Sequence, residues 1–427
     1  SIAAAIIVTR QNADQDMGQV VLNQMFEEPK SLGISAGVLI VMGLVPGMPH
    51  FAFLLLGGLA GLGAWWSTRH AKQVKAKAEA KALAPVTSSP VAEQKDLSWD
   101  DVSPVDVIGL EVGYRLIPMV DRSQGGELLN RIKGVRKKLS QELGFLIPPV
   151  HIRDNLDLQP NQYRITLMGV NMGEAEVYHD REMAINPGQV FGAIQGVATR
   201  DPAFGLDAVW IGKDQTDQAQ SLGYTVVDAS TVVATHMSQL LSNHAAQLLG
   251  HEEVQNLLDM VGRSQPKLVE GLIPGVMSLG TLVKVLQNLL TEGVPVRDMR
   301  TLLQTLVEYG PRSQDPDVLT AACRIALRRL IVQDIVGGES VIPVITLAPD
   351  LERILHQSLQ AGGAEGAGIE PGLAERMQQS LIEASQRQEL DGQAAVLLTS
   401  GVLRNTLARF VKNSIPGLRV LSYQEIP

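Results

Sequence analysis

The stretch SLGISAGVLIVMGLVPGMPHFAFLLLGGLAGLGAWWST, residues 31–68, carries no charged side chain, and His50 is its one titratable group. At its centre, residues 46–49 read PGMP, and two prolines with a glycine interrupt any continuous helix. We therefore predict a membrane α-helical hairpin with helices over 31–45 and 51–66. Each helix would be shorter than the ~20 residues that usually span a bilayer, so a hairpin buried in a soluble core is the alternative.

The flanks of the hairpin favour the membrane interpretation. Each helix contains two glycines four residues apart, a spacing typical of helices that pack closely in lipid. Trp65 and Trp66 lie where an interfacial aromatic belt is expected, and a basic run follows at 69–81. Because the turn at 46–49 has no Lys or Arg, both ends of the hairpin are predicted to face the cytoplasm.

The residues on either side extend this picture. Residues 1–9 are apolar, and we expect them to be the tail of a further membrane helix, so that 1–67 forms the end of a transmembrane domain. Residues 68–106 are predicted to be a flexible linker, basic at first and then rich in Pro, Ser and Thr. Trp99 lies beside acidic residues in this linker with no local core to enter. It packs either on its own domain or on a neighbouring subunit.

Bulk composition limits the function classes. A chain of 427 residues predicts about three domains. Its net charge of −9 argues against a nucleic-acid partner, which would require a basic surface. Cys323, the single cysteine, lies on the apolar face of a helical pattern and is predicted to be a small buried hydrophobe. One cysteine permits no internal disulfide, which fits a reducing compartment.

Residues 107–248 predict an α+β region in which one subdomain is inserted in another. The first subdomain covers 107–179 and 229–248, and the insert covers 180–228. Apolar alternation and an amphipathic stripe predict a strand at 110–116 and a helix with a solvated basic face at 128–143. Further strands are predicted at 150–153, 162–170, 175–178, 183–185, the end of 201–211, and 224–227, with a loop at 188–200. Asp228 or Ser230 is predicted to cap a helix that runs through Leu248.

The remainder divides into a helical and a mixed part. Apolar stripes, with prolines at helix starts or breaks, predict a helical third subdomain over 249–333. A fourth subdomain, 334–427, is predicted to be a C-terminal parallel α/β domain. Its predicted strands are 341–347, 395–399 and 418–422, and its predicted helices are 350–359, 371–389 and 403–413. The predicted fold is thus a membrane hairpin followed by an α+β multidomain cytoplasmic region.

No stretch has the pattern of a known catalytic or cofactor motif. The sequence GKD at 212–214 lacks the glycine loop of a nucleotide-binding strand–turn–helix. The glycines at 362–368 fall between two predicted helices, and GHEEVQ at 250–255 lacks the second histidine of a zinc-protease helix. We predict a non-enzyme with no catalytic residue, cofactor or metal. A membrane-anchored sensor or enzyme is the alternative from another class.

Five segments together resemble the FHIPEP family, the export gates of type III protein secretion. They are LEVGYRLIP at 110–118, VHIRDNLDLQP at 150–160, FGLDAVWI at 204–211, ASTVVATH at 229–236 and VPVRDMRT at 294–301. The resemblance extends over essentially the whole chain. The form of 151–159 resembles the flagellar branch more than the virulence injectisome branch, and an injectisome export gate is the alternative.

The resemblance implies a nonameric ring in the bacterial inner membrane, driven by the proton motive force, with a large cytoplasmic region. That region would dock export chaperones with flagellar cargo and pass substrates into the channel. Other export-apparatus membrane proteins and the cytoplasmic ATPase complex are the further implied partners. Family members have additional membrane helices upstream, and we expect the last subdomain to continue beyond Pro427.

The resemblance also implies two sets of site residues. The family's chaperone site is a hydrophobic dimple between the first two subdomains, and the matching positions are Ile185, Pro187, Asp201, Phe204, Leu206 and Thr235. Trp99 and Asp101 match a linker segment that docks on an adjacent subunit. Without the resemblance, a phenylalanine between proline and glycine could equally anchor its own loop in a core, which is the alternative for Phe204.

Overall fold

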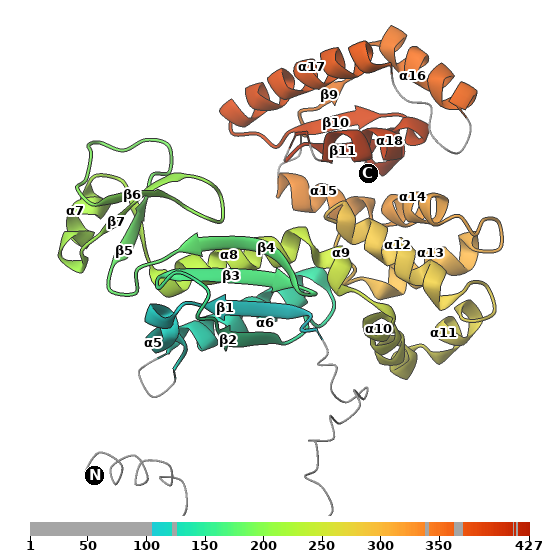
Figure 1. The fold of residues 1–427 in the computed structure, drawn as a ribbon. Coiled ribbons are helices and arrows are strands. Elements are labelled where there is room, and N and C mark those ends of the chain that lie inside the picture. Colours follow the sequence, from blue (N-terminus) through green and yellow to red (C-terminus); the bar gives the residue numbers. More distant parts are fainter. Residues whose placement is uncertain (1–104, 122–125, 338–340, 363–369, 413, 416) are drawn as a thin grey trace, which may run out of the picture. The chain divides into compact units, whose positions relative to one another are not determined.

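The computed structural model describes residues 105–121, 126–337, 341–362, 370–412, 414–415 and 417–427 (Figure 1). The predicted hairpin at 31–66, the helix tail at 1–9, and Trp99 and Asp101 in the linker lie outside these ranges. Within them, none of the helices has the length and apolar character needed to cross a membrane. Residues 103–427 group into one compact unit, and the structure is described for this unit alone.

The first sheet has four strands in the order β2-β1-β3-β4. β1 pairs in parallel with β2 and antiparallel with β3, and the antiparallel pair of β3 and β4 completes the sheet. The strands are β1 (Ile108–Val112), β2 (Val150–Asp154), β3 (Gln162–Leu167) and β4 (Val170–Glu176). The parallel step from β1 to β2 needs a crossover, which η2 (Tyr114–Leu116), α5 (Ile117–Val120) and α6 (Glu127–Leu143) provide.

The strand predicted at 110–116 ends at Val112, and residues 114–116 instead form a 3-10 turn. Gly113 explains the change, because its N–H donates to Gln162 O at 2.8 Å and a Cβ there would lie 2.2 Å from Gln159 O. The turn leaves Leu116 buried and Tyr114 exposed. Alternation beyond Val112 was therefore misleading.

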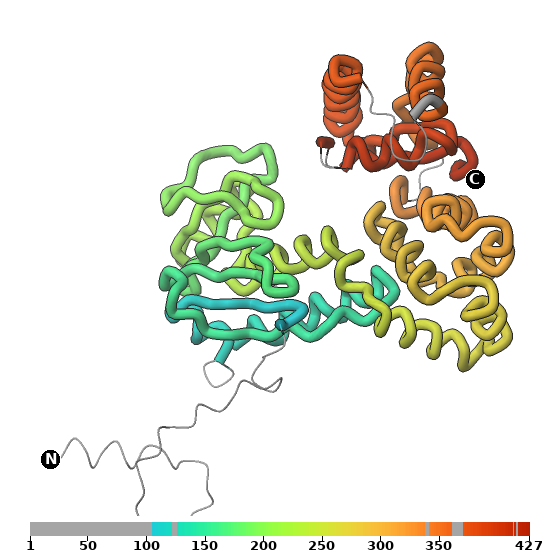
Figure 2. Tube along the Cα trace, turned by 45° about the vertical axis from the view of Figure 1, so that its right-hand side comes forward, coloured from blue at the N-terminus to red at the C-terminus, as the bar shows by residue number. Residues whose placement is uncertain are grey.

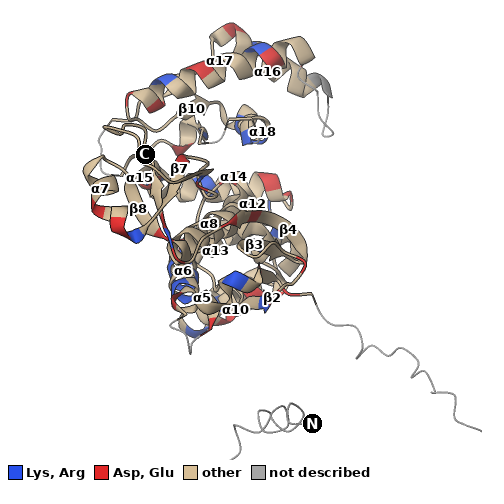
Figure 3. Cartoon of the chain, turned by 60° about the vertical axis from the view of Figure 1, so that its left-hand side comes forward, with Lys and Arg blue, Asp and Glu red and all other residues tan. Residues whose placement is uncertain are grey.

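Helix α6 has the predicted two-sided character. Leu128, Ile132 and Leu139 are buried, and its lysines, among the blue segments in Figure 3, are exposed. The predicted basic face also includes two arginines, and both have partners in the structure. Arg131 pairs with Asp228, and Arg136 donates to Ile147 O. The helix ends at Gly144, whose φ of 94° favours glycine.

The second sheet is formed by the segment between β4 and α8, the green part of the tube in Figure 2. Its order is β6-β7-β5-β8, with every pair antiparallel. The loop predicted at 188–200 is wrong in its last part, because Val197–Arg200 forms strand β6. None of the β6 side chains is buried, so no apolar alternation marked the strand. The other elements are β5 (Glu182–Ile185), β7 (Asp207–Ile211), η4 (Lys213–Gln215), α7 (Thr216–Ser221) and β8 (Thr225–Asp228).

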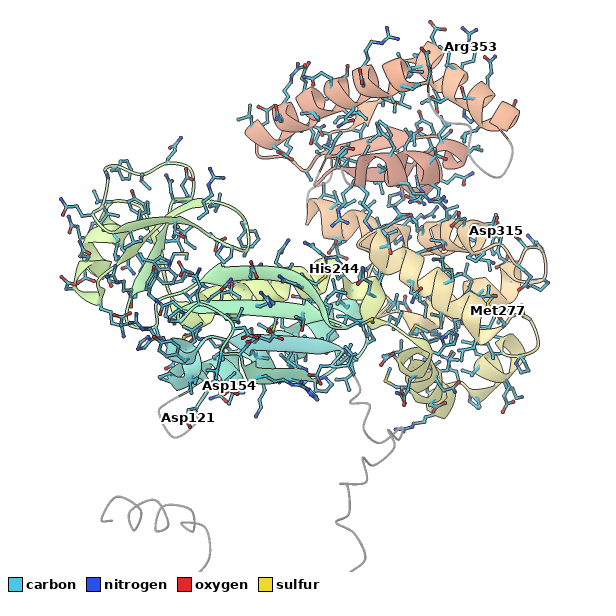
Figure 4. The ribbon with its side chains drawn as sticks, in the orientation of Figure 1. Asp121, Asp154, His244, Met277, Asp315 and Arg353 are labelled. Atoms are coloured by element: carbon cyan, nitrogen blue, oxygen red, sulfur yellow. The ribbon has the colours of Figure 1, made fainter. Side chains whose placement is uncertain are left out.

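Asp228, and not Ser230, caps the next helix, since its side chain accepts the Thr231 N–H at 2.7 Å. The single helix predicted to run through Leu248 is interrupted, giving α8 (Ala229–Asn243) and α9 (Ala245–Leu248). His244, labelled in Figure 4, lies at this interruption.

Six helices follow, and four of them contain the predicted apolar stripes. Pro266 and Pro316 occupy first-turn positions, and Ser278, Asp298 and Asp315 cap helices with their side chains. Leu282, Val285, Leu286 and Leu289, which form one of these stripes, are all fully buried. The helices are α10 (His251–Ser264), α11 (Pro266–Leu272), α12 (Leu279–Thr291), α13 (Met299–Tyr309), α14 (Pro316–Ala326) and α15 (Arg328–Val336).

The last sheet has the order β11-β10-β9 and is parallel, as predicted. The strand predicted at 341–347 is shorter, with only Ile345–Thr346 forming β9 next to Pro343, which has no N–H to donate. Helices α16, α17 and α18 share one apolar cluster, whereas Val396 and Leu421 belong to the core that includes the preceding helices. The remaining elements are α16 (Pro349–Gly362), α17 (Pro371–Leu390), β10 (Val396–Thr399), α18 (Gly401–Lys412), β11 (Arg419–Ser422) and η6 (Tyr423–Glu425).

Candidate functional site

The predicted chaperone-site residues centre on a tight turn at 201–206, between β6 and β7. Asp201 is 3% exposed and holds the turn, because its carboxylate accepts the Phe204 N–H at 2.8 Å. The Asp201 N–H donates to Leu206 O, and the Asp201 carbonyl accepts the Gly205 N–H, both at 2.8 Å. Gly205 has a φ of 71°, which favours glycine. We call residues 201–206 the Phe204 turn.

The Phe204 turn directs apolar side chains outward. Phe204 is 62% exposed and Leu206 is 40% exposed. This exposure contradicts the alternative in which Phe204 anchors its loop in a core. Phe204 is thus a large apolar side chain exposed on a turn that three hydrogen bonds hold in place.

Ile185 and Pro187 lie beside the end of the Phe204 turn. Ile185 ends β5 and pairs with Ala208 of β7, and the Asn186 N–H donates to Asp207 O at 2.9 Å. Ile185 is half-buried and Pro187 is exposed. The antiparallel pairing therefore gathers residues 185–187 and 206–208 at one end of the inserted sheet.

Thr235 comes from a different element, helix α8, which contacts β5. Thr235 is half-buried and lies between Ala234 and His236, which are both buried.

Tyr163 and His236 form a buried polar pair that no local sequence pattern predicts. The Tyr163 hydroxyl on β3 lies 2.7 Å from His236 Nδ1, and the two rings meet edge to face. Burial raises the pKa of Tyr163, and the Asp201 charge raises it further. Burial also lowers the pKa of His236, with the Asp201 charge acting in the opposite direction. Both partners are therefore neutral at neutral pH. We call Tyr163 and His236 the tyrosine–histidine pair.

A second buried cluster has full charges. Arg324 on α14 donates to both carboxylate oxygens of Glu425 at 2.9 and 3.0 Å, and lies 2.8 Å from Glu292. Arg404 on α18 donates to both carboxylate oxygens of Glu292. Arg324, Arg404 and Glu425 are at most 3% exposed. We call these four residues the charge cluster, and it joins the helical segment to the last sheet.

One serine–histidine contact bears on catalysis. Ser400 Oγ lies 2.9 Å from His356 Nε2, and Glu352 accepts the Ser400 N–H at 3.1 Å. The carboxylate therefore binds the serine backbone and does not orient the imidazole, as an activated serine would require. The contact ties α16 to the start of α18. Among the described residues, no cluster of His, Cys, Asp or Glu has the composition of a metal site.

Known proteins resemble the chain throughout its length. It is 52% identical over 427 residues to the flagellar biosynthesis protein FlhA of Escherichia coli K12, and 50% identical over 427 residues to FlhA of Salmonella typhimurium LT2. In both cases all of this chain aligns with 60% of the relative, so the chain spans less than two thirds of these proteins.

Solved structures share the fold. The Chlamydia pneumoniae CdsV protein superposes with a TM-score of 0.64 at 25% identity, covering 78% of this chain and 96% of CdsV. The nonameric SctV-C of enteropathogenic E. coli (EPEC) superposes with a TM-score of 0.61 at 22% identity, covering 76% of this chain and 96% of that protein. These likenesses establish a mixed α/β fold of the export-gate C-terminal type. Residues 1–427 match the FHIPEP family, and the chain belongs to it.

Proposed function

We propose that the chain is part of a flagellar type III export gate and that the Phe204 turn docks export chaperones with their flagellar cargo. Family membership and about 50% identity to proteins of flagellar biosynthesis support the flagellar assignment. The observation that carries the docking proposal is the exposed Phe204 ring on a turn that buried Asp201 holds in place.

The physical argument is one of preorganisation. A phenylalanine on a fixed turn loses little conformational freedom when a partner covers it, and aromatic anchors of this kind dominate many interfaces. Leu206, Pro187 and the half-buried Ile185 add apolar surface at the same end of the inserted sheet. A partner with a small apolar anchor of its own, such as an exposed leucine or isoleucine, suits this surface.

The wider assembly is proposed on the same basis. We place the chain in the bacterial inner membrane, with the region after the linker in the cytoplasm, as one subunit of a nonameric ring. Cytosolic domains of the same fold form nonamers, and CdsV has been solved in a complex with CdsO. Trp99 and Asp101 are proposed to dock on an adjacent subunit, and the four-subdomain division stays a prediction. Mass photometry of the full chain in detergent tests the ring, and Trp99→Ala should shift mass from nonamer to monomer.

An injectisome gate is the second candidate, favoured by the fold shared with injectisome-type structures. Their identities of 20–25% are about half of those to the flagellar relatives. Replacing the matching segment of a flagellar gate with this chain tests the choice. Restored swimming supports the flagellar proposal, and export without swimming supports the second candidate.

Phe204→Ala tests the docking proposal directly. The full chain in detergent is titrated with a purified flagellar chaperone–cargo complex, and the variant should bind at least about tenfold more weakly, as for loss of a buried aromatic anchor. Phe191→Ala is the matched control, since Phe191 is an 88% exposed phenylalanine of the same inserted segment outside the site. Equal affinities of Phe204→Ala and wild type, with unchanged melting temperatures, would show that the site lies elsewhere.

A further inference from the structure

The predicted docking residues lie on two different elements, and Asp228 is the residue at which these elements meet. Ile185 ends β5 in the inserted sheet, whereas Thr235 lies on α8. Asp228 ends β8, which pairs with β5 in a register that places Thr225 opposite Ile185. Asp228 also caps α8, because its Oδ1 accepts the Thr231 N–H at 2.7 Å. The chain therefore passes at Asp228 from one half of the docking surface to the element that carries the other half.

Apolar packing holds the inserted sheet on α8 but gives the contact little direction. Met183, Ala208 and Trp210 of the inserted sheet belong to the same apolar core as Val232 and Met237 of α8. The free energy gained by burying apolar surface depends on area and is non-directional. A contact of defined geometry is needed as well to hold the sheet in one orientation on the helix.

Arg131 supplies such a contact from a third element. It lies on α6, which packs against α8. Its Nη2 donates to Asp228 Oδ2, while Asp228 Oδ1 accepts from the first turn of α8. Arg131 also lies 3.5 Å from Glu127, one turn earlier on α6. Both oxygens of the Asp228 carboxylate are thus engaged by helices, and a charge-assisted hydrogen bond between such groups has a preferred direction.

We propose that Arg131 and Asp228 are positioning residues that orient the inserted sheet on α8 and so set the spacing between the two halves of the docking surface. The inference rests on the proposed docking function. The side chains of Arg131 and Asp228 are 37% and 41% exposed, so their ion pair is of moderate strength and salt weakens it. Affinity for the partner then follows the fraction of molecules in which the two halves are correctly spaced.

Pulsed electron paramagnetic resonance measures this spacing in the full chain. Nitroxide labels are attached at Gln218→Cys on α7, which packs against β8, and at Ser242→Cys on α8. Both positions are exposed, and a Cys323→Ala background leaves no other thiol. Excess unlabelled chain in the detergent sample ensures that only distances within one chain are recorded. With Arg131 and Asp228 intact, one main distance peak is expected, and 0.5 M salt should lower its population.

Four variants divide the outcomes. Arg131→Met and Asp228→Asn each remove the ion pair, although an asparagine can still cap α8, and each should raise the population outside the main peak by up to about fivefold. Arg131→Lys keeps the charge and should stay close to the unaltered protein. Lys138→Met is the matched control, since Lys138 pairs with Glu142 of its own helix. An unchanged main peak in both disruptive variants, or an equal loss in Lys138→Met, overturns the proposal.

Chaperone–cargo affinity is measured on the same four variants. A fall in affinity in proportion to the loss of the main peak supports the inference and the docking function together. Loss of the main peak with unchanged affinity overturns the role of the ion pair in docking. If wild type and Phe204→Ala bind alike, the docking function itself fails, and the distance distributions still decide whether Arg131 and Asp228 orient the inserted sheet.

Discussion

The charge cluster and the tyrosine–histidine pair are both buried and polar, but they balance charge differently. In the charge cluster, two arginines face two glutamates. Burial alone would lower the pKa of Arg324, but the hydrogen bonds and negative charges of Glu425 and Glu292 raise it. The tyrosine–histidine pair is neutral, and the nearby Asp201 charge is held by its own turn. The first arrangement holds two parts of the chain together firmly. The second joins strand β3 to helix α8 by one hydrogen bond and without an ion pair.

The largest effect is expected from breaking the charge cluster. Arg324→Met leaves buried Glu425 and half-buried Glu292 beside too little positive charge, and should lower the free energy of unfolding by about 3–5 kcal/mol. Urea denaturation of the full chain, followed by circular dichroism, measures the change. Adding Glu425→Leu removes the stranded charge and should restore part of the loss. A double variant less stable than the single variant would contradict this account.

Cys323 offers a chemical view of the same region, because it precedes Arg324 and is fully buried. Burial raises the pKa of its thiol to about 12. Since the thiolate is the reactive form, iodoacetamide at pH 8 should label the native chain at least about a hundredfold more slowly than the unfolded chain. Arg324→Met should reduce this difference between the labelling rates of the native and unfolded chains. Equal labelling rates for native and unfolded chains would mean that Cys323 is accessible.

The sequence predicts the elements of these regions far better than their contacts. The stripe of Leu282, Leu286 and Leu289 follows from local periodicity, and all three are buried. By contrast, Arg324 and Glu425 are 101 residues apart, and Tyr163 and His236 are 73 apart. Each of these residues alone resembles a surface charge or a strand tyrosine. Only the packing of distant elements makes them partners, and no local pattern encodes that packing.

The candidate site divides in the same way. Residues 204–211 could be matched to a family motif, so Phe204 and Leu206 were predicted as site residues, and their exposure fits that assignment without testing it. Strand β6, which leads into the Phe204 turn, was missed because its side chains are not buried on either face. The burial of Asp201 was equally unpredictable, since a single aspartate before a proline usually lies at the surface.

The tyrosine–histidine pair predicts a specific pH dependence. The pKa of His236 in the folded chain is lowered from 6.5, chiefly by burial, so the unfolded chain binds the proton more readily. The stabilisation is therefore fully present above pH 6.5 and is lost as pH falls below that value. The melting temperature should fall between pH 7 and pH 5.5, and less steeply in His236→Asn. Identical slopes for the two proteins would show that His236 does not contribute.

The smallest effect is expected at an ion pair that joins the same two segments as the charge cluster. Arg409 on α18 pairs with Asp317 at the start of α14, but their side chains are 66% and 42% exposed. Water and salt screen such a pair, so Arg409→Ala should lower the free energy of unfolding by no more than about 1 kcal/mol, and by less in 0.5 M salt. Arg324 and Arg409 each bond a carboxylate between the helical segment and the last sheet with its helices, so they differ mainly in burial. If Arg409→Ala destabilises the chain as much as Arg324→Met, burial is not the reason for the strength of the charge cluster. The number of ion pairs alone would then decide how firmly the helical segment is held to the last sheet.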